Sequence, residues 1–258
     1  MSPDQAIYNS PRLAAGYAFN RPPVHSHIIQ TIGQRLFAGG RVRRALDIGC
    51  GAGLSTAALE PLAERVAGIE PVAAMLQHHR AVAPHALFVA GQAERLPFAD
   101  EAFELLTAAG SVNYSDLDLF LPEAARVLMP GGMLVIYDFS AGRRLRGNTL
   151  LEEWYDAFEH RYPPLPGYAL DVRGLAYERA GLYPGSYDEL EIAIPMNAAS
   201  YLAYAMSETS IEAAIRRGAS EAEVSVWCRD TLSPVFGNEF KEVIFDAYIA
   251  CVRKGAGK

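Results

Sequence analysis

Between residues 44 and 139 the chain alternates short apolar runs with stretches whose apolar residues recur at helical spacing. Short apolar runs bounded by turns are typical of buried strands. The pattern predicts five strands, at RALDI (44–48), RVAGIE (65–70), ALFVA (86–90), FELLTAAG (103–110) and MLVIYDF (133–139). Because strands that alternate with helices form parallel sheets covered on both faces, this segment predicts an α/β fold.

The flanking segments show weaker patterns. We predict helices around residues 24–37 and over 198–217 and 220–233, one or two more within 143–184, and strands at 188–196 and 239–254. No segment has the composition of a linker, so we expect a single domain over residues 1–258.

Composition narrows the class of protein. Hydrophobic residues make up 50% of the 258, enough for a packed core, and the net charge of −7 disfavours nucleic-acid binding. Three cysteines provide no disulfide framework. Because no apolar run reaches the roughly 20 residues that span a bilayer, and no secretory signal begins the chain, we expect a cytoplasmic protein without membrane contact.

A glycine-rich turn follows the first predicted strand. In DIGCGAG (47–53), Gly49, Gly51 and Gly53 lack Cβ atoms, so the backbone can turn tightly and a ligand can approach it. Glu70 ends the second strand 21 positions after Gly49. A carboxylate at that place can accept hydrogen bonds from ribose hydroxyls, so an adenosine-type ligand fits.

The glycine spacing separates the possible nucleotides. The G-x-G-x-x-G fingerprint of nicotinamide and flavin sites would need glycine at Leu54, and the third glycine comes one position earlier. A phosphate-binding P-loop needs Gly-Lys-Ser/Thr, and the first lysine of the chain is Lys241. A ligand without pyrophosphate therefore fits better.

The ordered motifs resemble the class I S-adenosylmethionine-dependent methyltransferases of the small-molecule branch. DIGCGAG is similar to the first motif of that family, and Glu70-Pro71 to its acid-ending second strand. GQAERLPFADEAFEL (91–105) resembles its adenine-side loop, and EAARVLMPGGMLVI (123–136) its helix–turn–strand unit. The resemblance spans residues 44–140 and fades after Phe139.

This resemblance implies a Rossmann-like three-layer sandwich with a helical cap. Its seven-stranded sheet would be mostly parallel, with the last strand antiparallel. The implied regions are a lid with helices (1–40), a cofactor-binding core (41–140), cap helices (141–187 and 197–235) and final strands (188–196 and 239–254).

The resemblance also assigns S-adenosylmethionine as cofactor. The residues implied in binding it are Asp47, Gly49, Cys50, Gly51 and Gly53 in the first motif, Glu70 for the ribose hydroxyls, Pro71 and Met75 against the adenine, Gln92 and Ala93 at the adenine edge, and Gly110 after the fourth strand. The family often has Asp where Gln92 stands, and a Gln amide can both donate and accept hydrogen bonds.

Residues 1–23 lie outside the core of alternating strands and helices. We predict that they form a segment that covers the cofactor. The ring of Tyr17 could attract a sulfonium cation, and Arg21 could pair with the cofactor carboxylate. The alternative is a terminal arm that packs on the sheet edge for stability alone.

Catalytic residues are less constrained, since methyl transfer needs a base only when the acceptor loses a proton. Strand ends offer Asn113, Tyr114 and Asp138, and the cap offers His160. Asp138 and Tyr114 are our candidates, because ligands gather at the carboxyl ends of such sheets. Asp138 fits equally well as a helix cap or loop acid. No cysteine or carboxylate completes a metal site with a histidine pair.

The acceptor is predicted to be a small molecule with an O, N or C nucleophile. GSVNYSD (110–116) lacks the proline pair of amino-methylating DNA enzymes, and no basic stripe suits RNA. Ten of the 13 tyrosines lie at or after Tyr137, where they could wall a pocket or pack the cap. The alternative function is S-adenosylmethionine binding with non-methylating chemistry or a regulatory role. The oligomeric state stays open.

Overall fold

The computed structural model describes residues 3–166 and 170–256. The strands are β1 (Val42–Ile48), β2 (Ala63–Glu70), β3 (Leu87–Ala90), β4 (Phe103–Ala109), β5 (Leu128–Phe139), β6 (Arg144–Leu145), β7 (Leu182–Met196) and β8 (Lys241–Lys254). The α-helices are α1 (Pro3–Tyr8), α2 (Pro11–Phe19), α3 (Val24–Phe37), α4 (Leu54–Leu59), α5 (His79–Val82), α6 (Leu117–Val127), α7 (Leu150–Arg161), α8 (Ala198–Met206), α9 (Thr209–Arg216) and α10 (Glu221–Phe236). Short 3₁₀ helices are η1 (Met75–His78), η2 (Val112–Tyr114), η3 (Val172–Gly174) and η4 (Tyr177–Ala180).

One mixed sheet contains all eight strands of the described residues. Strands β3, β2, β1, β4 and β5 lie side by side in that order and run parallel. Strand β8 is antiparallel to β5 on one edge and to β7 on the other, and two-residue β6 pairs with β8 beyond β5. The predicted mostly parallel sheet with an antiparallel last strand is confirmed, with β6 as an addition.

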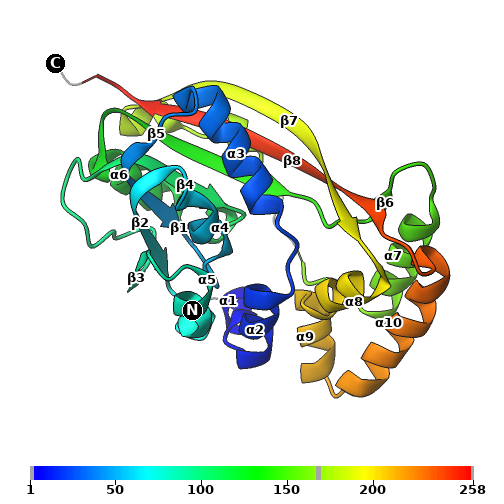
Figure 1. The fold of residues 1–258 in the computed structure, drawn as a ribbon. Helices are drawn as coiled ribbons and strands as arrows, with labels where there is room; N and C mark the ends of the chain where they lie inside the picture. The colour runs from blue at the N-terminus through cyan, green and yellow to red at the C-terminus, as the bar shows by residue number, and fades with distance from the viewer. Residues whose placement is uncertain (1–2, 167–169, 257–258) are drawn as a thin grey trace.

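Helices cover both faces of this sheet (Figure 1). Side chains alternate along a strand, so Ala45 and Leu46 of β1 enter different cores. Ala45 packs in the core that contains α3 and α4, and Leu46 packs in the core that contains α6 and η4. These two cores give the three layers that the resemblance implied.

The cap is built from α7, α8, α9 and α10, which lie together beyond the ends of β7 and β8 (Figure 1). Trp154 of α7 stacks on Phe158 at 5.1 Å and packs edge-on against Tyr201 of α8 at 5.6 Å. These rings belong to the same hydrophobic core as Tyr137 of β5. The cap therefore packs directly onto the sheet. Within the described residues, no helix is both long and apolar enough to cross a membrane.

Several element boundaries differ from the prediction, and β5 begins at Leu128 rather than at residue 133. Strand β7 begins at Leu182 rather than at residue 188, because Pro184 and Gly185 lie at a β-bulge instead of in a turn. The predicted helix over 198–217 is two helices, α8 and α9, separated at residues 207–208. Between β2 and β3 the chain forms only η1 and the single turn α5.

Candidate functional site

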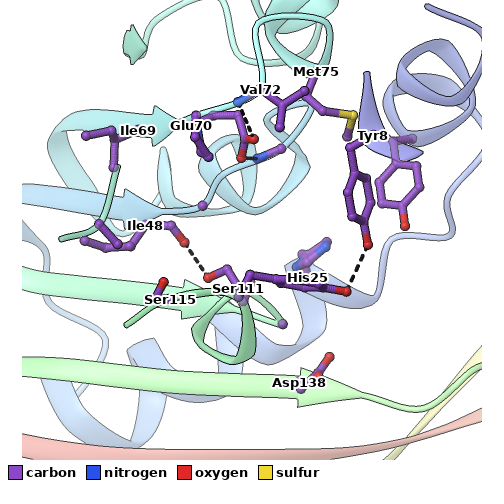
Figure 2. Close-up of a pocket in the computed structure, with 18 of the residues that line it drawn as sticks. Tyr8, His25, Ile48, Ile69, Glu70, Val72, Met75, Ser111, Ser115 and Asp138 are labelled. Atoms are coloured by element: carbon purple, nitrogen blue, oxygen red, sulfur yellow. Dashed lines mark hydrogen bonds between the residues drawn. The ribbon is translucent and has the colours of Figure 1, made fainter. Parts of the chain in front are cut away.

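A cavity of about 270 Å³ opens at the carboxyl ends of β1, β2, β4 and β5. Figure 2 shows Glu70, Val72 and Met75 on one side of it and Ser111 and Asp138 on the other. A second cavity of about 110 Å³ adjoins it and shares part of its lining. The predicted residues that line the first cavity are Tyr17, Arg21, Gly49, Gly51, Glu70, Pro71, Met75, Ala93, Gly110, Tyr114 and Asp138.

The glycine turn needs its glycines for two different reasons. Gly49 and Gly51 both have left-handed backbone, with φ of +67° and +54°, a region that side chains disfavour. A Cβ on Gly49 would lie 2.4 Å from Ser111 Cβ, so Gly49 allows two loops to touch. A Cβ on Gly51 would meet only Met75, at 3.5 Å, beside the cavity. Gly51 therefore leaves room at the cavity wall.

Glu70 joins the glycine turn to the loop that follows β2. The backbone N–H of Gly51 donates to Glu70 Oε2 (3.0 Å), and that of Val72 donates to Oε1 (2.9 Å). Burial raises the pKa of the Glu70 carboxyl, while these two backbone donors act in the opposite direction. Each oxygen keeps a free lone pair, so the carboxylate can still accept hydrogen bonds from a ligand.

Asp47 lies beneath the turn rather than on the cavity, and none of it is exposed (0%). Its Oδ2 accepts hydrogen bonds from Ser55 Oγ (2.6 Å) and Thr56 Oγ1 (2.7 Å), and its Oδ1 accepts one from Thr107 Oγ1 (3.0 Å). Burial raises its pKa to about 6 despite these three hydroxyl donors. Asp47 thus ties β1 to α4 and β4, and it can hold the turn in place without touching a ligand.

The opposite wall is formed by the loops after β4 and β5. Asp138 Oδ1 accepts the backbone N–H of Phe139 (2.8 Å), and burial raises the pKa of this carboxyl. Gly110, with φ of +58°, lets the carboxylate approach closely, since a Cβ there would lie 2.9 Å from Oδ1. Ser111 Oγ donates to the carbonyl of Ile48 (2.7 Å), which fixes the loop against β1.

The N-terminal helices cover the cavity. Tyr8 at the end of α1 packs edge-on against Tyr17 and Tyr114, with ring centroids 6.1 and 5.9 Å away. The Tyr8 and Tyr114 hydroxyls lie 3.1 Å apart, within hydrogen-bond distance, as Figure 2 shows for Tyr8. The segment thus reaches the loop after β4 across the opening.

Arg21 holds this segment to the cap. Its guanidinium donates to Glu208 Oε1 (3.0 Å) and to the carbonyl of Ser207 (2.9 Å), and lies 4.1 Å from the ring centroid of Tyr17. Its buried Nε has no hydrogen-bond partner among the described residues. Because one face of Tyr17 contacts Arg21, that face is closed to the sulfonium contact we predicted.

Several predicted residues lie elsewhere. Cys50 lines only the second cavity. Gly53 is the N-cap of α4, and a Cβ there would lie 3.1 Å from the Phe88 ring, so it serves helix–strand packing. Gln92 and His160 are exposed and outside both cavity linings. The cap tryptophans and tyrosines of the described residues do not line the first cavity, because they pack in the core.

Sequence reasoning missed several residues of the wall. His25 and Phe139 line both cavities, and Ser111 and Ser115 line the larger one. Ser111 directly follows Gly110 at the end of β4, so the rule about strand carboxyl ends could have found it. His25 has no local signal, because only the packing of α3 against the sheet brings it to the site.

Known proteins resemble the core of this chain. A family model described as a methyltransferase domain matches residues 46–136. Over 92 residues the chain is 36% identical to an uncharacterized methyltransferase of Mycobacterium tuberculosis, covering 36% of this chain and 38% of that protein. Over 89 residues it is 39% identical to the ubiquinone/menaquinone biosynthesis C-methyltransferase of Azotobacter vinelandii, covering 34% of each. These matches span less than half the length of either relative.

A solved structure shares the whole fold. It is a candidate type II methyltransferase from Anaeromyxobacter dehalogenans, with a TM-score of 0.65 at 21% identity over 90% of this chain and 95% of that one. Its likeness covers the cap as well as the sheet. The family model covers the glycine turn and Glu70, so residues 46–136 of this chain are similar to a methyltransferase domain.

Proposed function

We propose that this protein transfers the methyl group of S-adenosylmethionine to a small-molecule acceptor. The observation that carries the proposal is the cavity in which Glu70 and the glycine turn face Asp138 across the strand ends. Ligands of doubly wound folds bind at this edge of the sheet. The methyltransferase domain match covers the glycine turn and Glu70 and ends two residues before Asp138.

The described residues fit this cofactor. Glu70 would hold the ribose hydroxyls, and the wall left open at Gly51 would accommodate the adenosine. Met75 and Pro71 offer apolar contact for the adenine, with Ala93 near them in the lining. The buried Nε–H of Arg21, which has no partner in the described chain, would donate to the ligand carboxylate.

When bound, the cofactor supplies a sulfonium-linked methyl group that a nucleophile displaces in line. The N-terminal helices exclude water from the cavity, with Tyr8 and Tyr114 over its opening. The cavity walls hold the acceptor near the methyl group, which is the main catalytic task. Asp138 accepts the proton of an acceptor that must lose one, at Oδ2, because Oδ1 takes the Phe139 N–H.

A small acceptor suits the size and lining of the larger cavity. Its lining offers flat apolar surface from the aromatic rings of Tyr8, Tyr17, Tyr114 and Phe139, with the Asp138 carboxylate near them. The ubiquinone/menaquinone C-methyltransferase relative suggests an aromatic ring carbon as one nucleophile to test. Three free, buried cysteine thiols agree with a reducing, cytoplasmic setting.

The test is a panel of small phenol, amine, carboxylate and quinol acceptors incubated with S-adenosylmethionine. We expect S-adenosylhomocysteine release in step with consumption of at least one acceptor, with Asp138→Asn slowed about 100-fold for a proton-losing acceptor. The matched control is Asp118→Asn, an exposed acid on α6. Consumption without S-adenosylhomocysteine would instead support the non-methylating alternative.

A further inference from the structure

A buried hydrogen bond joins α3 to the middle of the sheet beside the cavity. Tyr137 of β5 is fully buried, and its hydroxyl lies 3.0 Å from His25 Nδ1. The His25 ring also packs edge-on against Phe139, with centroids 5.1 Å apart. His25 lines both cavities, and Figure 2 shows it between Tyr8 and Ser111.

The buried hydroxyl decides which atom donates. In the part of the chain that the structure describes, His25 Nδ1 is the one hydrogen-bond partner of the Tyr137 hydroxyl. If Nδ1 carried the hydrogen instead, the buried Tyr137 O–H would have no acceptor, at a cost of about 1–3 kcal/mol. Tyr137 therefore donates and Nδ1 accepts. A neutral imidazole that accepts at Nδ1 carries its hydrogen at Nε2.

The charge states agree with this direction. Burial, followed by the positive charge of Arg21, lowers the pKa of His25 to about 4, so the ring is neutral near pH 7. Burial raises the pKa of Tyr137 well above its usual range, so its hydroxyl keeps its hydrogen. The remaining polar group of His25 is a fixed N–H donor at a ring that lines both cavities.

Arg21 provides a second free donor at the same place. Arg21 lies just before α3 and His25 in its first turn, and both line the second cavity, whose described lining includes neither Glu70 nor Asp138. The buried Nε of Arg21 has no partner in the described residues. Two N–H donors without an acceptor suit an oxygen anion, and a planar carboxylate offers two oxygens.

We propose that His25 Nε2–H, with its tautomer set by Tyr137, and Arg21 Nε–H together bind a ligand carboxylate in the second cavity. This rests on the proposed function, in which that carboxylate belongs to the amino-acid end of the cofactor. Tyr137 is then a positioning residue, since it acts through His25.

The first test measures the tautomer without any ligand. Nuclear magnetic resonance of the full chain with ¹⁵N-labelled histidine should show His25 protonated at Nε2 and unprotonated at Nδ1 at pH 7. Tyr137→Phe removes only the hydroxyl and should produce a mixture of the two tautomers. A His25 hydrogen on Nδ1 in the unaltered protein would overturn the proposal.

The second test uses two ligands that differ at the amino-acid end. S-adenosylhomocysteine has the carboxylate, and 5′-methylthioadenosine lacks it. His25→Asn can still accept from Tyr137 but loses the Nε2 donor, whereas His25→Gln places an amide N–H near the Nε2 position. His27→Asn, at an exposed residue of the same helix, is the matched control.

By titration calorimetry, His25→Asn should weaken S-adenosylhomocysteine binding about tenfold or more and leave 5′-methylthioadenosine within about twofold. His25→Gln should recover most of that loss. Unchanged S-adenosylhomocysteine affinity, or equal weakening for both ligands, would refute the carboxylate contact. If the unaltered protein binds neither ligand, the proposed function fails, while the resonance experiment still decides the tautomer.

Discussion

At the scale of single residues, the site depends on two buried carboxylates with different tasks. Glu70 faces the cavity and has lone pairs to spare, whereas Asp47 uses its oxygens for three hydroxyls beneath the turn. Both have a pKa raised by burial. Because their surroundings differ, we expect substitution of Glu70 to weaken ligand binding and substitution of Asp47 to change the stability of the fold.

Glu70→Ala should weaken S-adenosylmethionine binding about 10- to 100-fold, because it removes charge-assisted hydrogen bonds worth about 1.5–3 kcal/mol. Titration calorimetry measures this, with Glu64→Ala on the exposed part of the same strand as control. Affinity should also fall on acidification, and at higher pH than for an exposed glutamate, since the pKa of Glu70 is raised. Equal affinities for the two variants would remove Glu70 from the site.

Gly51→Val should abolish cofactor binding, because its side chain enters the cavity wall and its backbone is left-handed. Gly131→Val tests backbone strain alone: its φ is +74°, and a Cβ there has nothing within 4 Å. Circular dichroism should show both variants folded. Normal binding by Gly51→Val would mean that the turn is only structural.

Asp47 predicts a pH dependence of stability. Its folded-state pKa of about 6 exceeds the ordinary 3.8, so the folded chain binds more protons than the unfolded chain between these values. The Asp47 contribution to the free energy of unfolding is fully present below pH 3.8 and is lost as pH rises through about 6. The whole change is about 3 kcal/mol.

Asp47→Asn cannot ionise and should lose this dependence. Urea unfolding from pH 4 to 7 should therefore show the unaltered protein losing stability relative to Asp47→Asn as pH rises. A constant difference between the two proteins across that range would contradict the assignment. Asp100→Asn, at an exposed loop acid, serves as the control.

At the scale of elements, α1 and α2 are tied to the cap. Arg216 of α9 donates to the carbonyls of Ala6 (2.9 Å) and Ile7 (3.1 Å), and Arg12 of α2 donates to Glu212 Oε2 (2.9 Å). Neither the predicted covering segment nor the alternative of an arm on the sheet edge included contacts with the cap. The segment covers the cavity while anchored to helices more than a hundred residues away in sequence.

Removal of residues 1–20 should leave a folded chain with weaker cofactor binding, because the core strands and their helices remain. Arg216→Ala is a milder change, because it removes the hydrogen bonds that hold α1 to α9 without deleting the segment. It should raise the amide exchange of α1 and the dissociation rate of S-adenosylhomocysteine about threefold or more. Arg217→Ala, its exposed neighbour on the chain, should change neither. Full affinity in the truncated chain would show that the segment serves stability alone.

Local motifs explain how much the sequence could predict. Gly49 and Glu70 come from short patterns at strand ends, where backbone geometry leaves few choices. Arg21 and His25 depend on partners far along the chain, Glu208 and Tyr137, which no local pattern specifies. The aromatic residues of the cap have side chains that can line a pocket or fill a hydrophobic core. In the structure they pack in the core.

At the scale of the whole molecule, one core joins the cap to the sheet. Trp154 and Phe236 of the cap share a hydrophobic core with Val135 and Tyr137 of β5 and with Ile28 of α3. We therefore expect a single cooperative unfolding transition. Calorimetric and van't Hoff enthalpies should agree. Two separated transitions would show that the cap is an independent unit.

Strand β8 also determines the order in which the fold can be completed during synthesis. It lies between β5 and β7, and in the described chain β7 pairs with no other strand. A ribosome makes residues 241–254 after the other strands of the described chain. The edge of β5 therefore stays unpaired while residues 140–240 emerge, and that of β7 while residues 197–240 emerge. Exposed strand edges invite pairing with other chains. We therefore expect the nascent chain to be prone to pairing with other chains until β8 inserts.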